Sequence, residues 1–371
     1  MRRILAISLI LIAGHLFSQK FGIIGDFRYS ATCDTINASE LVKSWDPEFI
    51  VTVGDLSDPA CNTIDHEIGR YFSDYIYPYY GAYGSTATHN RFVSTLGNHD
   101  QEGDGLTQYL EYFTLPGNER YYDTLIGNVH IFILNSAGTE PDGPFYYSIQ
   151  GLWLESAMAE STAPWKLIFF HHPPYTSGNH GNSTWMQWPF AEWGATAVFS
   201  GHDHDYERLF VSGVYYFVAG IGGGDLRAFT TVNEYSLKRV SGIHGALLCN
   251  AYSDSLVIEC ISVSDSLLDR QVIFPGSTNV KQVKDDMFLY PNPITKSFSI
   301  AFDGGNYSEA KLSITDLAGH EILKQEIQIK EGYQEISFEL SKVFISDPKP
   351  GVYLVSLLLG EVVYRGKMVI E

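Results

Sequence analysis

Short apolar segments alternate with longer polar or helix-like segments from Phe21 to about Phe274. The apolar segments are rich in β-branched and aromatic residues, which is typical of buried strands, and each is followed at once by Asp, Asn or His. Helix-like segments such as 38–45 and 152–160 lie between several of them. This alternation predicts an α/β fold with polar residues at the carboxyl ends of the strands, where such folds bind their ligands.

A different pattern follows Phe274. Short alternating strands, among them SFSIAF, KLSITD and VYLVSLLL, are separated by Gly, Asn and Pro, which predicts a small β-sandwich. We therefore expect four parts in chain order: a signal peptide at 1–18, an α/β domain at 19–275, a linker at 276–285 and a β-sandwich domain at 286–371.

The N-terminus has the pattern of an export signal. Met1 is followed by two arginines and a mostly apolar run, residues 4–17, with the small residue Ser18 before a plausible cleavage point. A buried first helix is the alternative. The run is short for a bilayer span and no later segment is long enough, so we expect a secreted mature chain without a transmembrane segment.

Composition and charge narrow the range of partners. The 371 residues are 45% hydrophobic and 18% charged, which is typical of a globular protein with room for two domains. A formal net charge of −19 argues against binding to a nucleic-acid backbone. A small phosphorylated substrate remains compatible with this charge, because metal ions can reverse the potential inside a cleft.

Good metal ligands end five of the strand-like segments: Asp26, Asp55, Asn98 with His99, His171 with His172, and His202 with His204. Carboxylate, amide and imidazole groups suit borderline or hard cations such as Fe, Zn or Mn. A carboxylate can bridge two cations, so the set predicts two metal ions per chain, which would orient a phosphoryl group and activate a water. Each residue alone is common at a strand end, and the prediction depends on their order and spacing together.

The motifs GD, GD, GNHD, HHPPY and GHDHDYER, in this order, resemble those of the calcineurin-type metallophosphoesterases. The last motif is similar to that of the purple acid phosphatases. The resemblance covers roughly 21–274. It implies a four-layer αββα sandwich, a dinuclear metal centre at the strand ends and hydrolysis of phosphate esters.

The resemblance also implies a role for each matching residue. One metal would be held by Asp26 and His204 and the other by Asn98, His171 and His202, with Asp55 as the bridge. His99 corresponds to the family's histidine that contacts the phosphate and protonates the leaving group, and Asp100 would orient it. His172 would pack beside the centre.

Substrate-binding roles are expected for His180, Tyr175 and Arg28. His180 aligns with a substrate-facing histidine of the plant-type members. Arg28 departs from the family, which has Gly there, and Asp58 stands where the family has a metal-binding Tyr, so the protein should not be purple even with iron bound. We expect Arg28 and Asp58 to form a charge-assisted pair. The alternatives are Asp58 as a metal ligand with Arg28 as a phosphate clamp, or two solvated surface residues.

The C-terminal part carries a second resemblance. FLYPNPITKSFSI, ITDLAGHEI and GVYLVSLLLGEVVYRGKMVIE are similar to a type IX secretion sorting domain. This implies export through the periplasm, recognition by the type IX secretion machinery, and a secreted or cell-surface protein. A carbohydrate-binding β-sandwich is the alternative.

Three functions follow as hypotheses. The first is a secreted dinuclear-metal phosphatase that hydrolyses phosphate monoesters by attack of a metal-bound hydroxide. The others are a phosphodiesterase or nucleotidase on the same core, and a surface binding protein with a degenerate metal site. Two cysteine pairs, Cys33 with Cys61 and Cys249 with Cys260, are either disulfides or free thiols, and the second is expected to lie directly opposite in a hairpin.

Overall fold

The computed structural model describes residues 18–27, 34–57, 63–275, 282–284, 287–305, 307–316, 321–344, 349–359 and 362–370. The expectations for residues 1–17, for Arg28 and Asp58, and for the Cys33–Cys61 pair lie outside these ranges. The chain divides into two compact units, one built almost wholly from residues before 276 and the other mainly from residues after it.

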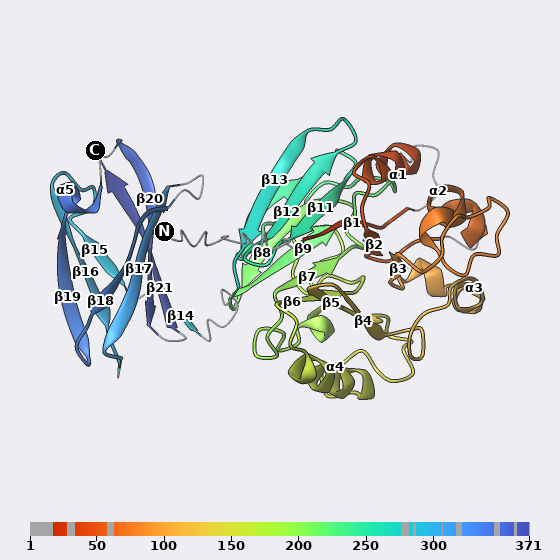
Figure 1. The fold of residues 1–371 in the computed structure, drawn as a ribbon, viewed down its shortest axis with the longest axis horizontal. Helices are drawn as coiled ribbons and strands as arrows, with labels where there is room; N and C mark the ends of the chain where they lie inside the picture. The colour runs from red at the N-terminus through yellow and green to blue at the C-terminus, as the bar shows by residue number, and fades with distance from the viewer. Residues whose placement is uncertain are drawn as a thin grey trace, which may run out of the picture. The chain divides into compact units, whose positions relative to one another are not determined.

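Two mixed β-sheets form the centre of the first unit (Figure 1). In the described ranges one sheet has the order β13-β12-β11-β1-β2-β3 and the other the order β10-β8-β9-β7-β6-β5-β4. The strands of the first sheet are β1 (Gln19–Ile24), β2 (Phe49–Thr52), β3 (Phe92–Val93), β11 (Gly245–Ala251), β12 (Leu256–Ser262) and β13 (Leu267–Ile273). Those of the second are β4 (Tyr122–Ile126), β5 (Val129–Ile133), β6 (Trp165–Phe169), β7 (Ala197–Ser200), β8 (Tyr206–Val211), β9 (Val214–Ala219) and β10 (Ser236–Val240).

The central strands are parallel and covered on both faces. β1, β2 and β3 run parallel in one sheet, and β5, β6 and β7 run parallel in the other. Every residue of β2 and of β7 is buried, which explains why these segments are mainly apolar rather than alternating. Stacked rings of Phe169, Phe199 and Phe217 join β6, β7 and β9, with centroids 4.8 and 5.1 Å apart.

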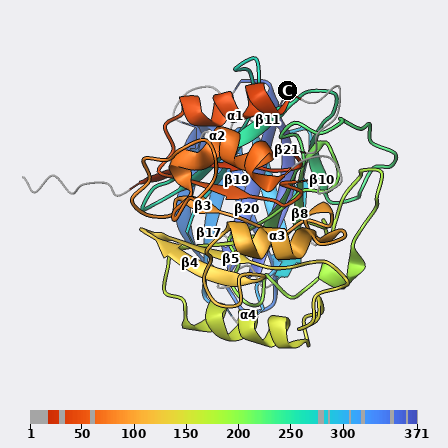
Figure 2. The same cartoon turned by 90° about the vertical axis from the view of Figure 1, so that its right-hand side faces the viewer.

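Helices cover the outer faces of the two sheets. Figures 1 and 2 show α1 (Thr35–Ser44) and α4 (Ile149–Glu160) on opposite sides of the pair of sheets. The shorter helices α2 (Arg70–Phe72) and α3 (Gly105–Tyr112) lie among the loops after β2 and β3. The expected α/β sandwich is confirmed. Within the described part of the chain, no helix combines the length and apolar character that crossing a membrane requires.

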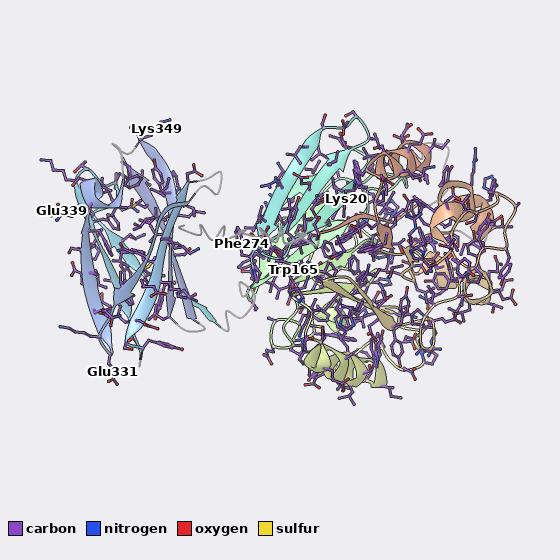
Figure 3. All side chains as sticks on the ribbon, viewed as in Figure 1. Lys20, Trp165, Phe274, Glu331, Glu339 and Lys349 are labelled. Carbon is purple, nitrogen blue, oxygen red and sulfur yellow. The ribbon has the colours of Figure 1, made fainter. Side chains whose placement is uncertain are left out.

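The parallel strands of both sheets begin at the same end of the unit. Figure 3 shows Lys20, near the start of β1, and Trp165, at the start of β6, on the same side. Asn128, just before β5, donates its backbone N–H to the side chain of Gln19 (3.1 Å). The carboxyl ends of the parallel strands of both sheets therefore meet at the opposite end.

The second unit is entirely β-sheet apart from the single-turn helix α5 (Leu340–Val343) in the ranges that are described. Its sheets have the orders β14-β21-β20-β17-β18 and β15-β16-β19. The strands are β14 (Gln282–Lys284), β15 (Phe288–Tyr290), β16 (Ser297–Asp303), β17 (Glu309–Asp316), β18 (Glu321–Gln328), β19 (Tyr333–Glu339), β20 (Gly351–Leu359) and β21 (Val362–Ile370). Phe298, Leu312 and Leu357 belong to its apolar core, which confirms the all-β expectation. β14 lies within the segment that we expected to be a linker and pairs with β21.

Cys249 and Cys260 are both free and buried. They are not opposite one another, because Cys249 faces Ile258 and Cys260 faces Leu247. The turn closes where Tyr252 donates its N–H to the carbonyl of Ser255 (2.8 Å), so the register is two residues away from the one expected. The prediction that these two cysteines lie directly opposite was wrong.

Candidate metal centre

The expected ligands stand directly after the parallel strands. Asp26 follows β1, Asp55 follows β2, and His202 follows β7. All three have positive φ angles, 56°, 51° and 70°, which are uncommon for residues with a side chain and turn the chain sharply as the strand ends. Such conformations persist where the surrounding structure holds them, as happens at functional sites.

A glycine precedes four of the six expected ligands and lets neighbouring loops approach closely. A Cβ atom at Gly97, before Asn98, would collide with Oδ1 of Asp55, and one at Gly201 would collide with Oδ2 of Asp26. The recurring Gly-Asp, Gly-Asn and Gly-His pairs of the sequence therefore have a common steric cause.

Asp55, His171 and His202 form a cluster whose ligand atoms lie within 4.8 Å of one another. Nε2 of His171 is 3.2 Å from Oδ2 of Asp55, 3.1 Å from Oδ1 of Asn98 and 3.2 Å from Nδ1 of His202. Ligands about 2.0–2.1 Å from a tetrahedral ion are separated by roughly 3.3–3.4 Å, so this spacing fits one cation.

Asp26 and His204 form the adjacent part of the centre. Nε2 of His204 lies 3.5 Å from Oδ1 of Asp26. Oδ2 of Asp26 is buried and has no hydrogen-bond partner among the described residues. Burial and the charge of Asp55 raise the pKa of Asp26 well above its usual value. A bound cation would satisfy this oxygen and stabilise the carboxylate.

Two of the imidazoles are held by backbone carbonyls. Nδ1 of His171 donates to the carbonyl of Val53 (2.8 Å), and Nδ1 of His204 donates to that of Asp225 (2.7 Å). These bonds occupy Nδ1 and direct Nε2 at the carboxylates, which is how metal-binding histidines are usually oriented.

The electrostatics of the cluster couple Asp55 to His171. Burial alone would lower the pKa of His171, but the charges of Asp55 and Asp26 raise it to about 9. Burial alone would raise the pKa of Asp55, but His171 and His99 lower it strongly. Burial and the His171 charge lower the pKa of His202, so its imidazole is neutral and suited to bind a metal.

His99 lies at the rim of the cluster. Its backbone N–H donates to Oδ1 of Asp55 (3.0 Å), and its Nε2 lies 3.9 Å from Oδ2 of the same residue. Its Nδ1 is 3.1 Å from Oε1 of Glu102, and the side chain is 18% exposed. The ring therefore borders both the ligands and the solvent.

The contacts of Asp100 differ from those that we expected. Its carboxylate accepts hydrogen bonds from the backbone N–H groups of Leu56, Ser57 and Gly97 (2.8–3.2 Å), rather than orienting the His99 ring. It thus joins the loop after Asp55 to the loop that carries Asn98. Burial and the charge of Asp55 raise the pKa of Asp100 to about 6.

The His180 ring packs against the cluster, whereas Tyr175 packs among other tyrosine rings. The His180 ring stacks on His202 with centroids 4.0 Å apart, and its Nδ1 donates to Oδ1 of Asp203 (3.0 Å). Tyr175 contacts Tyr216 and Tyr235 edge-on and lines a separate open pocket of about 710 Å³.

Three further residues complete the surroundings. His172 is packed between Trp185 and His202, in line with a packing role, and burial lowers its pKa to about 3. Asp203 and Arg227, which contact His180 from two sides, were missed at the level of sequence. The position of Asp203 between the two motif histidines was a usable signal. Arg227 stands alone in GGGDLRAF, without any informative spacing.

Both parts of the chain are similar to known protein families. A family model described as calcineurin-like phosphoesterase matches residues 19–206, and one described as a secretion system C-terminal sorting domain matches residues 288–371. The chain is 26% identical over 229 residues to a phosphoenolpyruvate phosphatase of Allium cepa, covering 54% of this chain and 44% of that protein. It is 24% identical over 220 residues to purple acid phosphatase 3 of Arabidopsis thaliana, covering 51% and 58%. The chain thus spans about half the length of these curated relatives.

A solved structure shares the fold. Purple acid phosphatase PPD1 from yellow lupin seeds superposes with a TM-score of 0.58 at 16% identity, covering 70% of this chain and 54% of that one. At this identity the likeness concerns the fold alone.

Proposed function

The chain belongs to the calcineurin-like phosphoesterase family, and on this premise we propose that it is an exported phosphatase that hydrolyses phosphate monoesters at a two-metal centre. The observation that carries the proposal is the convergence of Asp55, His171 and His202 within 4.8 Å, beside a buried Asp26 oxygen without a hydrogen-bond partner in the described ranges. Carboxylate and imidazole donors of this kind suit Fe, Zn or Mn.

Each group of ligands has a role in this proposal. Asp26 and His204 would hold one metal, Asn98, His171 and His202 the other, and Asp55 would bridge them. When bound, the pair would neutralise phosphoryl charge and activate a water for attack. His99, at the exposed rim, is suited to hold the proton that the leaving group takes. Asp100 keeps the two ligand loops together through the backbone.

Export is the second part of the proposal. The match of residues 288–371 to a secretion system C-terminal sorting domain supports delivery to the cell surface or the medium. We infer that the type IX machinery recognises the second unit after passage through the periplasm.

Hydrolysis of para-nitrophenyl phosphate and of its bis-ester by the metal-loaded protein tests the proposal. A phosphatase should prefer the monoester. Preference for the bis-ester would favour a phosphodiesterase. Failure to cleave either ester by a protein that holds two metals would contradict enzymatic function and favour a binding protein.

A further inference from the structure

The loop after β9 passes beside the metal centre and carries Arg227. The backbone N–H of Arg227 donates to the carbonyl of His204 (3.0 Å), and that of Gly224 donates to the carbonyl of Asp26 (2.8 Å). The loop is therefore fixed by main-chain bonds to both residues of the Asp26–His204 part of the centre, and the place of Arg227 relative to that centre does not depend on its side chain.

The guanidinium group of Arg227 contacts one of the residues stacked on the ligands. Its Nη1 donates to Nε2 of His180 (2.6 Å). His180 in turn donates from Nδ1 to Asp203 (3.0 Å), and its ring stacks on His202. The second oxygen of Asp203 accepts the hydroxyl of Thr176 (2.8 Å). A chain of contacts from Asp203 through His180 thus holds the guanidinium one ring away from a candidate metal ligand.

Arg227 differs from Arg208 and Arg120, which form ion pairs with carboxylates. Arg208 is paired with Asp269 (2.7 Å), and Arg120 is paired with Glu140 (3.1 Å). In the described ranges Arg227 has no carboxylate within ion-pair distance, and only its Nη1 has a side-chain hydrogen-bond partner. The side chain is partly exposed, so solvent reaches it. A guanidinium in this state is suited to receive an oxyanion.

Buried acids surround the centre, so the positive charge of one arginine side chain affects how readily an anion approaches. Asp26, Asp203 and Asp205 are fully buried in this region. The guanidinium of Arg227 contacts His180, whose ring stacks on the candidate ligand His202, so the cation lies near the ligands. Positive charge beside these acids favours the approach of a phosphate dianion, and Arg227 carries such a charge.

We propose that Arg227 binds a non-reacting oxygen of the substrate phosphate and makes the site selective for monoesters over diesters. In this proposal His180 positions the guanidinium group of Arg227. This rests on the proposed function. A monoester dianion has three non-bridging oxygens where a diester has two, and a guanidinium can bind the additional oxygen with a charge-assisted contact. An esterified oxygen offers no such partner, so the contact discriminates between the two classes.

The test compares Arg227→Met and Arg227→Lys in the full-length, metal-loaded protein. Loss of a charge-assisted contact should lower kcat/KM for para-nitrophenyl phosphate by roughly 10- to 100-fold, and should weaken the binding of inorganic phosphate, measured by calorimetry, to a similar extent. The bis-ester should lose much less, and Arg227→Lys should recover part of the phosphate affinity. Metal content should not change. Arg239→Gln removes one positive charge from the exposed surface of β10 and is the matched control.

The outcomes separate this inference from the proposed function. An equal loss for both esters, or unchanged phosphate affinity in Arg227→Met, would overturn the role of Arg227 while leaving a phosphatase in place. If the wild-type protein cleaves neither ester, the proposed function fails, and the phosphate affinities of wild type and Arg227→Met still decide whether Arg227 binds the anion.

Discussion

Among single residues, Asp55 has the central position in the candidate metal centre. Its Oδ2 lies 3.2 Å from His171, and its Oδ1 accepts the backbone N–H of His99. A neutral amide bridges two cations poorly, so Asp55→Asn should abolish ester hydrolysis and weaken the retention of both metals. Metal analysis with the ester assay checks this, with Asp254→Asn in an exposed turn as the control. An active Asp55→Asn protein with two full metal equivalents would refute the bridging role.

His99 should behave differently, because it borders the cluster without being at ligand distance from it. His99→Ala should keep both metals and lower kcat by roughly 10²- to 10⁴-fold, as expected for loss of a general acid. The loss should shrink for esters with good leaving groups, which need no proton. Rates for a series of phenyl phosphates measure this. A collapse of metal content would instead identify His99 as a ligand.

The residues of the candidate metal centre could be named from the sequence because five short motifs follow one another in a fixed order. The contacts of Asp100 could not. Its partners Leu56 and Ser57 lie 44 and 43 residues earlier, and only the meeting of two strand-end loops brings them together. The contact of Arg227 could not be predicted for the same reason, since its partner His180 lies 47 residues away on another loop.

At the scale of elements, one ion pair joins the two sheets of the first unit. Arg208 on β8 donates to Asp269 on β13 (2.7 Å), and the hydroxyl of Tyr206 donates to the same carboxylate (2.8 Å). Burial alone would raise the pKa of Asp269, but these partners lower it below its usual value. A lowered folded-state pKa means that the stabilisation is complete above the unfolded-state pKa and is lost as the pH falls through the folded-state pKa.

Asp269→Asn should therefore lower the free energy of unfolding by roughly 1.5–3 kcal/mol at pH 7, the range for hydrogen bonds to charged groups. The difference from wild type should shrink below about pH 4. Urea unfolding at pH 7 and pH 3 measures it. Glu259→Gln, which removes a more exposed pair with Arg270 on the neighbouring strands, should have a much smaller effect. A pH-independent loss would show that packing, not charge, is responsible.

The strands themselves were predictable, whereas their register was not. The apolar segments before Asp26, Asp55 and His171 became β1, β2 and β6, because strands buried on both faces read as continuous apolar runs. The register of Cys249 and Cys260 depended on where a tight turn closes, and the residues between them allow more than one position.

For the whole molecule, the change of pattern near Phe274 falls close to the main boundary between two units, for which we propose different tasks. The proposed ligands all precede residue 205, and the second unit has an apolar core of its own. A protein that ends at Phe274 should fold and hydrolyse phosphate esters, but it should not reach the cell surface in the native host. Ester assays on the purified shortened protein, and fractionation of host cells, measure both parts. Loss of activity in the soluble shortened protein would show that the second unit shapes the active site.

The most direct test of a two-metal phosphatase is stepwise reconstitution of the metal-free, full-length protein, with bound metal and para-nitrophenyl phosphate hydrolysis measured at each addition. The six proposed ligands predict that binding saturates at two equivalents and that activity rises mainly with the second, because Asp55 is proposed to join two cations in one centre. Full activity after complete chelation, or at one equivalent with no further rise, would contradict it.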